Sequence, residues 1–166
     1  MMQRYAFAAL WVLLSGDLAA QTHRVVATSQ HCKPLSEVQR AWLPTGWAQF
    51  DDYTRACPIL DAKKRPVLFL VSVWAALYYR SQDQPVVEQV EMPRPLLFLT
   101  SGQIAGDLPA NFPDAPPAAL RVTFAQWTRD FPLRIELFLS DPRAGGSRAL
   151  PSLRWDPSRL KYAASQ

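Results

Sequence analysis

The sequence predicts an α+β domain, in which a small N-terminal helical pair packs on a mainly antiparallel sheet that ends in a C-terminal β-meander. Three observations lead to this prediction. The clearest helix signals lie in the first third of the chain after its apolar start, apolar and polar residues alternate in later segments, and turn residues separate those segments at hairpin spacing. Helices followed by antiparallel strands are typical of the α+β class. A small β-sandwich with a helical appendage is the alternative.

The first twenty residues have the layout of a secretory signal peptide. Arg4 gives a basic start, residues 5–14 are an apolar run, and small residues precede a cleavage position after Ala20. A retained membrane anchor is the rival, but about ten apolar residues cover only about 15 Å, half of a bilayer core. We therefore expect a signal peptide over 1–20 and a single globular domain over 21–166. Arginine outnumbers lysine, as in GC-rich bacterial genomes, which suggests a bacterial source. For an exported bacterial protein the expected destination is the periplasm or the exterior.

Cys32 and Cys57 are the two cysteines of the chain. An even cysteine count in an exported protein predicts a disulfide between them. A redox site is the functional alternative, but the Cys-x-x-Cys spacing of such sites is missing.

Helix signals follow the first cysteine. Ser36 is placed to cap a helix over 37–42, in which Val38 and Trp42 share one face. A second short helix is predicted over 47–56, before Pro58. The disulfide would then join the two ends of a helical pair.

The most hydrophobic internal stretch runs from Val67 to Tyr79. Its β-branched and aromatic residues favour a buried strand over 67–74, whereas residues 75–77 fit a helix equally well. Thirteen residues are too few to cross a bilayer comfortably, so a membrane-associated component is only an alternative. Residues 96–100 form a second short apolar strand in this prediction.

Prolines crowd the segment from Gln103 to Ala119. Because proline removes backbone donors and favours extended conformations, we expect a loop or strap over the surface.

The β-meander is the clearest local prediction. Apolar and polar residues alternate over 120–127 and over 133–139, with a connection of hairpin length between them. A third strand is expected around 153–155, and a last piece around 160–162. Phe138 departs from the alternation because it points to the polar face, where it is either exposed or covered by the proline-rich strap.

No catalytic constellation stands out in the sequence. The two histidines, His23 and His31, both lie in the N-terminal segment, eight residues apart and without an acidic cluster around them. Glu88 and Glu91 are the candidate carboxylate pair of a hydrolase, but their separation in space decides that role. We therefore expect no catalytic residues, no metal and no cofactor, with an envelope or sugar-active hydrolase as the alternative.

The charge of the chain gives little support for nucleic-acid binding. The formal net charge is +4, and the basic residues are spread along the chain, apart from the short run over 63–65. Nucleic-acid binding requires a basic face interleaved with stacking aromatics. We expect neither a nucleic-acid partner nor stable membrane insertion after signal cleavage.

Aromatic and arginine residues of the predicted meander are the best candidates for a binding face, because these residue types dominate protein–protein hot spots. The candidate residues are Trp127, Phe138, Trp155, Arg134, Arg143 and Arg154. The sequence thus favours a non-enzymatic domain that binds another envelope or secreted protein. It would act as an accessory subunit of an envelope assembly or as an inhibitor or immunity-type factor.

Overall fold

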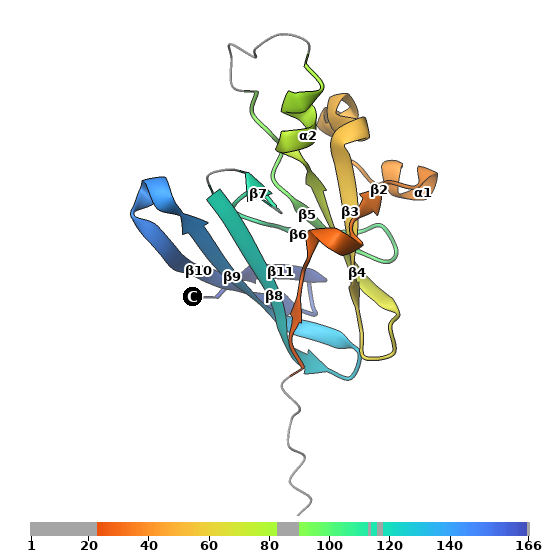
Figure 1. Ribbon diagram of the computed structural model, residues 1–166. Helices are drawn as coiled ribbons and strands as arrows, with labels where there is room; N and C mark the ends of the chain where they lie inside the picture. Colours follow the sequence, from red (N-terminus) through yellow and green to blue (C-terminus); the bar gives the residue numbers. More distant parts are fainter. Residues whose placement is uncertain (1–22, 83–89, 113, 116–117, 166) are drawn as a thin grey trace, which may run out of the picture.

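Two antiparallel sheets make up most of this protein (Figure 1). The computed structural model describes residues 23–82, 90–112, 114–115 and 118–165. Sheet A has the strand order β1-β8-β9-β10-β11, with β7 also paired to β8, and sheet B has the order β2-β3-β4-β5-β6. The predicted predominance of antiparallel sheet is therefore confirmed.

The elements have the following bounds. Sheet A contains β1 (Val25–Val26), β7 (Asp114–Ala115), β8 (Ala118–Thr128), β9 (Phe131–Asp141), β10 (Gly146–Asp156) and β11 (Lys161–Ala164). Sheet B contains β2 (Lys33–Pro34), β3 (Thr54–Leu60), β4 (Pro66–Val73), β5 (Leu96–Leu99) and β6 (Ile104–Asp107). The helical segments are η1 (Ser29–His31), α1 (Glu37–Arg40), η2 (Thr45–Tyr53), α2 (Ala75–Arg80) and η3 (Pro142–Ala144).

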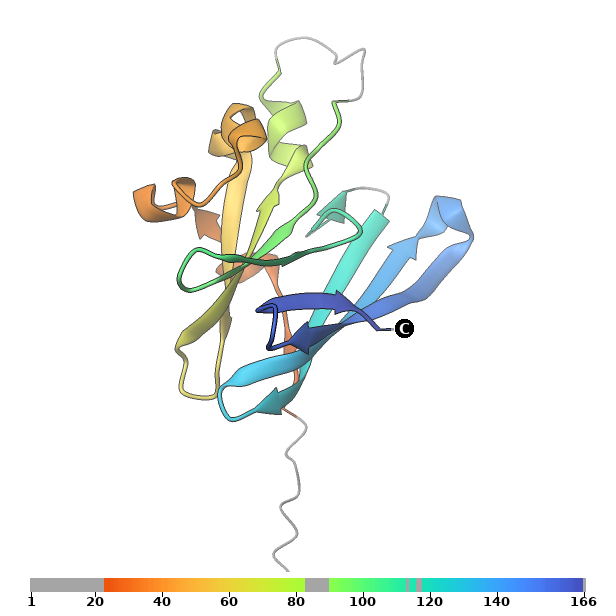
Figure 2. The ribbon, with the colours of Figure 1, turned by 180° about the vertical axis from the view of Figure 1, so that it is seen from behind.

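The two sheets bury their apolar faces against each other in one core. Val122, Phe124 and Ile135 of sheet A pack in the same cluster as Leu68 and Leu70 of sheet B, and all five are almost completely buried. The sheets lie close together at the β3–β4 and β8–β9 turns and diverge toward the β9–β10 hairpin, which points away from sheet B (Figures 1 and 2). The inward-facing apolar residues of β8 and β9 thus form the contribution of sheet A to the core.

A charged clamp joins the two turns where the sheets meet. The guanidinium of Arg65, after the β3–β4 turn, donates hydrogen bonds of 2.7 Å to Asp61 and to Asp130 of the β8–β9 turn. The carboxylate of Asp61 is buried and also accepts the backbone N–H groups of Lys63 and Arg65. Burial alone would raise the pKa of Asp61, but these hydrogen bonds outweigh it and hold the pKa below its ordinary value.

The helical segments are short. Ser36 caps α1 in a capping box with Gln39, but α1 itself spans only residues 37–40. Residues 45–53 form the 3-10 segment η2, and the predicted second helix is wrong beyond Tyr53, because Thr54 begins strand β3. The β-branched Thr54 pairs with Val73 and is fully buried there, which favours the extended backbone.

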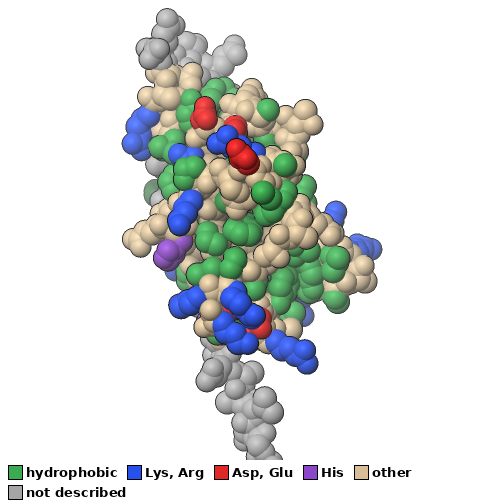
Figure 3. Space-filling model, turned by 90° about the vertical axis from the view of Figure 1, so that its right-hand side faces the viewer, with side chains coloured by type: hydrophobic (Ala, Val, Ile, Leu, Met, Phe, Trp, Pro, Cys, Tyr) green, Lys and Arg blue, Asp and Glu red, His purple; other side chains and the backbone are tan. Residues whose placement is uncertain are grey.

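The outer face of sheet B carries a second, smaller hydrophobic cluster. Trp47 and Phe50 of η2 pack against a group of buried residues on the strands, which are Ala56, Val71, Val73 and Phe98. On the side of the molecule where sheet B lies, hydrophobic side chains gather at the surface above a group of Lys and Arg (Figure 3). Sheet B is therefore covered on both faces, whereas sheet A has its core on one face only.

The hydrophobic stretch over 67–79 divides into two elements. The predicted strand corresponds to β4 and ends at Val73, whereas residues 75–80 form helix α2. In the part of the chain that the structure describes, no helix is long and apolar enough to cross a membrane.

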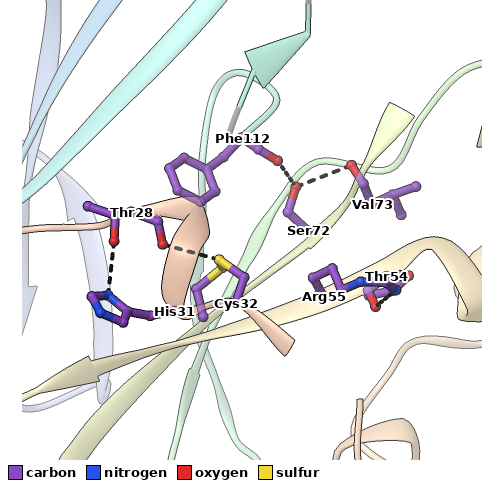
Figure 4. Close-up of a disulfide and its surroundings, with 9 residues drawn as sticks. Thr28, His31, Cys32, Thr54, Arg55, Ser72, Val73 and Phe112 are labelled. Carbon is purple, nitrogen blue, oxygen red and sulfur yellow. Dashed lines mark hydrogen bonds between the residues drawn. A yellow bond between two sulfur atoms is a disulfide. The ribbon is translucent and has the colours of Figure 1, made fainter. Parts of the chain in front are cut away.

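The predicted surface loop or strap over 103–119 is wrong in part, because strands β6 and β7 both lie in the described part of this proline-rich segment. Its Leu108 and Phe112 are buried in the core between the sheets. Ser72 of β4 donates a hydrogen bond to the carbonyl of Phe112, close to the disulfide (Figure 4). These two apolar side chains enter the core although the segment is otherwise polar and rich in proline, because the diverging sheets leave apolar surface that they can cover.

The predicted disulfide between Cys32 and Cys57 is confirmed. It joins the start of β2 to β3, next to the paired residues Lys33 and Ala56 (Figure 4). Cys57 is buried in the common core, so the bond ties the N-terminal segment to the interior. The predicted signal peptide over 1–20 and Glu88 lie outside the described residues.

Removal of the disulfide should lower stability strongly. Because the bond closes a loop with a sequence separation of 25 residues, we expect the double variant Cys32→Ser/Cys57→Ser to lose about 3–4 kcal/mol of unfolding free energy. Urea unfolding of the variant and of the oxidised wild type measures the difference. Equal midpoints for the two proteins would contradict the expectation.

Low pH should remove the contribution of the Asp61 carboxylate to the stability of the fold. A carboxyl whose pKa is lower in the folded than in the unfolded state stabilises the fold above its unfolded pKa of about 3.9, and this contribution is lost as the pH falls through the folded value. We therefore expect Asp61→Asn to be less stable than wild type near neutral pH and the gap to narrow below about pH 4. Urea titrations across this range test it, and a gap independent of pH would refute the role of the carboxylate.

Candidate functional site

The outer face of sheet A is the face opposite the core. On β9, Arg134, Glu136 and Phe138 alternate with the buried Ile135 and Leu137, so these three side chains share the outer face. Cross-strand pairing extends the face. Arg121 of β8 and Ala149 of β10 lie opposite Phe138, and Arg154 of β10 lies opposite Arg134.

A groove of about 510 Å³ crosses this face. We call it the arginine groove. Its charged walls are Arg24, Arg121, Arg134 and Glu136, and Thr123 and Ala149 lie between them. Thr123 is almost completely covered although it faces outward, so it lies at the bottom of the groove.

Arg24 and Glu136 form the one close ion pair of the groove among the described residues. The guanidinium of Arg24, just before β1, donates to both carboxylate oxygens of Glu136 on β9. Because β8 lies between β1 and β9, this pair spans the width of β8. It fixes the position of Glu136 and occupies one acceptor site on each of its carboxylate oxygens.

Arg134 has little compensation for its charge. The Oε1 atom of Glu136 lies 4.0 Å from the Nε atom of Arg134, and that nitrogen is buried without a hydrogen-bond partner among the described residues. Arg154 lies directly opposite on β10, and like charges in such positions repel each other. The side chain of Arg134 is 32% exposed and lines the groove.

Arg121 lies over the ring of Phe138. The guanidinium carbon is 4.8 Å from the ring centroid, which is the geometry of a cation–π pair. This contact holds the arginine in place without neutralising it. Arg121 therefore covers part of the Phe138 ring on the outer face.

The structure divides the predicted binding residues into two groups. Phe138, Arg134 and Arg154 share the outer face of sheet A, and Arg143 lies in the η3 turn at the tip of the β9–β10 hairpin. Trp127 and Trp155 instead pack against the common core.

The two tryptophans are held by contacts on the core side. The indole N–H of Trp127 donates to the carbonyl of Phe124 at 3.0 Å, and the left-handed backbone at Gln126 (φ 52°) interrupts the regular alternation before it. Trp155 packs against Phe131 and Tyr162, with ring centroids 4.8 and 5.1 Å away. Burial raises the pKa of Tyr162, whose hydroxyl donates to the carbonyl of Pro132.

Three groove residues were missed by the sequence analysis. Arg121 and Glu136 lie on the polar side of the predicted strands, so the alternation itself could have identified them. Arg24 could not have been placed, because only the pairing of β1 with β8, about a hundred residues away, brings it to this face.

The other candidate residues lie outside the arginine groove. His23 and His31 both line a cavity of about 320 Å³ beside the disulfide, where Nδ1 of His31 lies 2.9 Å from the Thr28 hydroxyl. No group of three metal-ligating side chains lies together in the described residues. Glu91 is exposed, and its predicted partner Glu88 is not described, so their pairing is untested.

The chain was compared with known families, proteins and structures. No protein-family model, no curated protein and no solved structure matches the chain.

Substitution of Arg154 should not harm folding. Arg154→Thr keeps a residue that suits a strand and removes a like charge opposite Arg134, so we expect unfolding free energy to stay equal or to rise by up to about 1 kcal/mol. Thermal and urea unfolding measure this effect at low ionic strength. A clear loss of stability would show that Arg154 is held by favourable contacts.

Proposed function

We propose that this chain is an exported, non-enzymatic domain that binds an acidic segment of a partner protein in the arginine groove. The observation that carries the proposal is the charge of the groove: three guanidinium groups face one carboxylate, which is already paired with Arg24. A carboxylate-bearing ligand would give Arg121 and Arg134 charge-assisted hydrogen bonds, which are stronger than those between neutral groups.

The composition of the groove suits a protein partner. Arginine and aromatic side chains are enriched at binding hot spots, and the groove combines both types in Arg121, Arg134 and Phe138. The cation–π contact holds Arg121 and Phe138 in place before a ligand arrives, and the ion pair does the same for Arg24 and Glu136, which lowers the entropic cost of binding. Such a partner would be another envelope or secreted protein.

Export is part of the proposal. The charged, apolar and small-residue layout of residues 1–20 supports a cleaved signal peptide. The disulfide supports an oxidising destination, such as a bacterial periplasm or the exterior. There the domain would act as an accessory subunit of an envelope assembly or as an inhibitor or immunity-type factor.

A direct test uses a fluorescein-labelled peptide with four acidic residues, Ser-Asp-Glu-Asp-Glu-Ser, in fluorescence polarisation. We expect the wild type to bind it, and Arg134→Thr to weaken binding about tenfold, which corresponds to about 1.4 kcal/mol. Added salt should weaken the interaction because the pairs are partly exposed.

Arg148→Thr is the matched control. Arg148 is an exposed arginine on the same strand as Arg154, but it lies opposite Leu139 on the other face of the sheet. The Arg148→Thr variant should bind the acidic peptide as tightly as the wild type does. Equal losses in both variants, or no binding by the wild type, would reject the arginine groove as the site.

Mass analysis of protein recovered from an expressing bacterium tests the export proposal. The mature chain should begin at Gln21 and appear in the periplasm or the medium. A full-length chain that remains in the cell would contradict it.

A further inference from the structure

A second groove adjoins the arginine groove. Arg121, Phe138, Ser140 and Ser147 on the outer face of sheet A form one part of its wall, and η1 together with the core residues Ala27, Phe112 and Leu120 forms the other part. This second groove has a volume of about 460 Å³ and lies toward the β9–β10 tip. Arg121 and Phe138 line both grooves, so this pair forms the boundary between them. We call the second one the hydroxyl groove, because Thr28, Ser29, Ser140 and Ser147 line it.

The chemistry of the two grooves differs. Among its described wall residues, the hydroxyl groove has Arg121 at the boundary as its one ionisable side chain, and the others are hydroxyl, amide or apolar. Ser147 donates to Ser140 at 3.1 Å, which leaves the hydroxyl proton of Ser140 available to a ligand. The positive charge is therefore concentrated in the arginine groove.

The two grooves together fit a short extended chain. Ser140 and Arg134 lie six positions apart on β9, which corresponds to about 20 Å of strand or about six residues of an extended peptide. A ligand of this length that follows β9 would pass Arg121 and Phe138 between its two ends, four positions from Arg134 and two from Ser140.

We propose that both grooves bind a single extended segment of the partner, with an uncharged polar half in the hydroxyl groove and an acidic half in the arginine groove. This inference rests on the proposed function and adds the order of polar and acidic residues along the ligand. A uniformly charged polymer fits less well, because half of its charges would lie against neutral hydroxyl and amide groups and lose hydration without compensation.

Four labelled hexapeptides test the pattern with the full chain. Two are half-acidic and opposite in direction, Ser-Gly-Ser-Asp-Glu-Asp and Asp-Glu-Asp-Ser-Gly-Ser. One has six acidic residues, and one has none. We expect one half-acidic peptide to bind at least as tightly as the fully acidic one, although it carries half the charge, and its reverse and the neutral peptide to bind at least tenfold more weakly.

A double variant, Ser29→Ala/Ser140→Ala, separates the two grooves. It should weaken the preferred half-acidic peptide severalfold and leave the fully acidic peptide unchanged, since the arginine groove is intact. Arg134→Thr should weaken both peptides.

The other outcomes distinguish this inference from the proposed function. If the fully acidic peptide binds about tenfold more tightly and depends on Arg134, the pattern is wrong and the acidic site stands. If a heparin hexasaccharide binds more tightly than every peptide, the ligand is an anionic polysaccharide, and both proposals fail. If neither the peptides nor heparin bind, both fail as well.

Discussion

The common core between the two sheets is the constraint on which the rest of the structure depends. Each sheet of a small β protein has an apolar face that must be removed from water, and here the two faces cover each other. Val122, Phe124 and Ile135 alternate with outward-facing residues. Burial of these three side chains in the core therefore makes their neighbours on β8 and β9 point to the outer face. A shift of one residue in β8 or β9 would place the arginines in the core.

The arginine groove follows from this arrangement. Because sheet B occupies the inner face of sheet A, the outer face remains polar, and its short residues Thr123 and Ala149 line the groove together with longer side chains. The pairing of β1 with β8 adds Arg24 from the start of the domain. The result is a surface whose charges are only partly paired with one another, which is why we assign it to a charged ligand.

Local patterns predicted local features well. The two cysteines predicted their bond, and the alternation over residues 120–139 predicted two paired strands with Phe138 on the polar face. Features set by distant contacts were missed. The burial of Leu108 and Phe112 depends on how far the sheets diverge, and the core-side packing of Trp127 follows the irregular backbone at Gln126. Neither has a periodic signal in the sequence.

Chemical-shift mapping by NMR tests the central claim most directly, because it locates the ligand on the protein without any substitution. The preferred half-acidic hexapeptide would be titrated into the isotope-labelled mature domain. The account predicts that the perturbed resonances follow β8, β9 and β10 on the outer face, including those of Arg121, Arg134 and Ser140. Perturbations centred on sheet B, or on the cavity beside the disulfide, would contradict it.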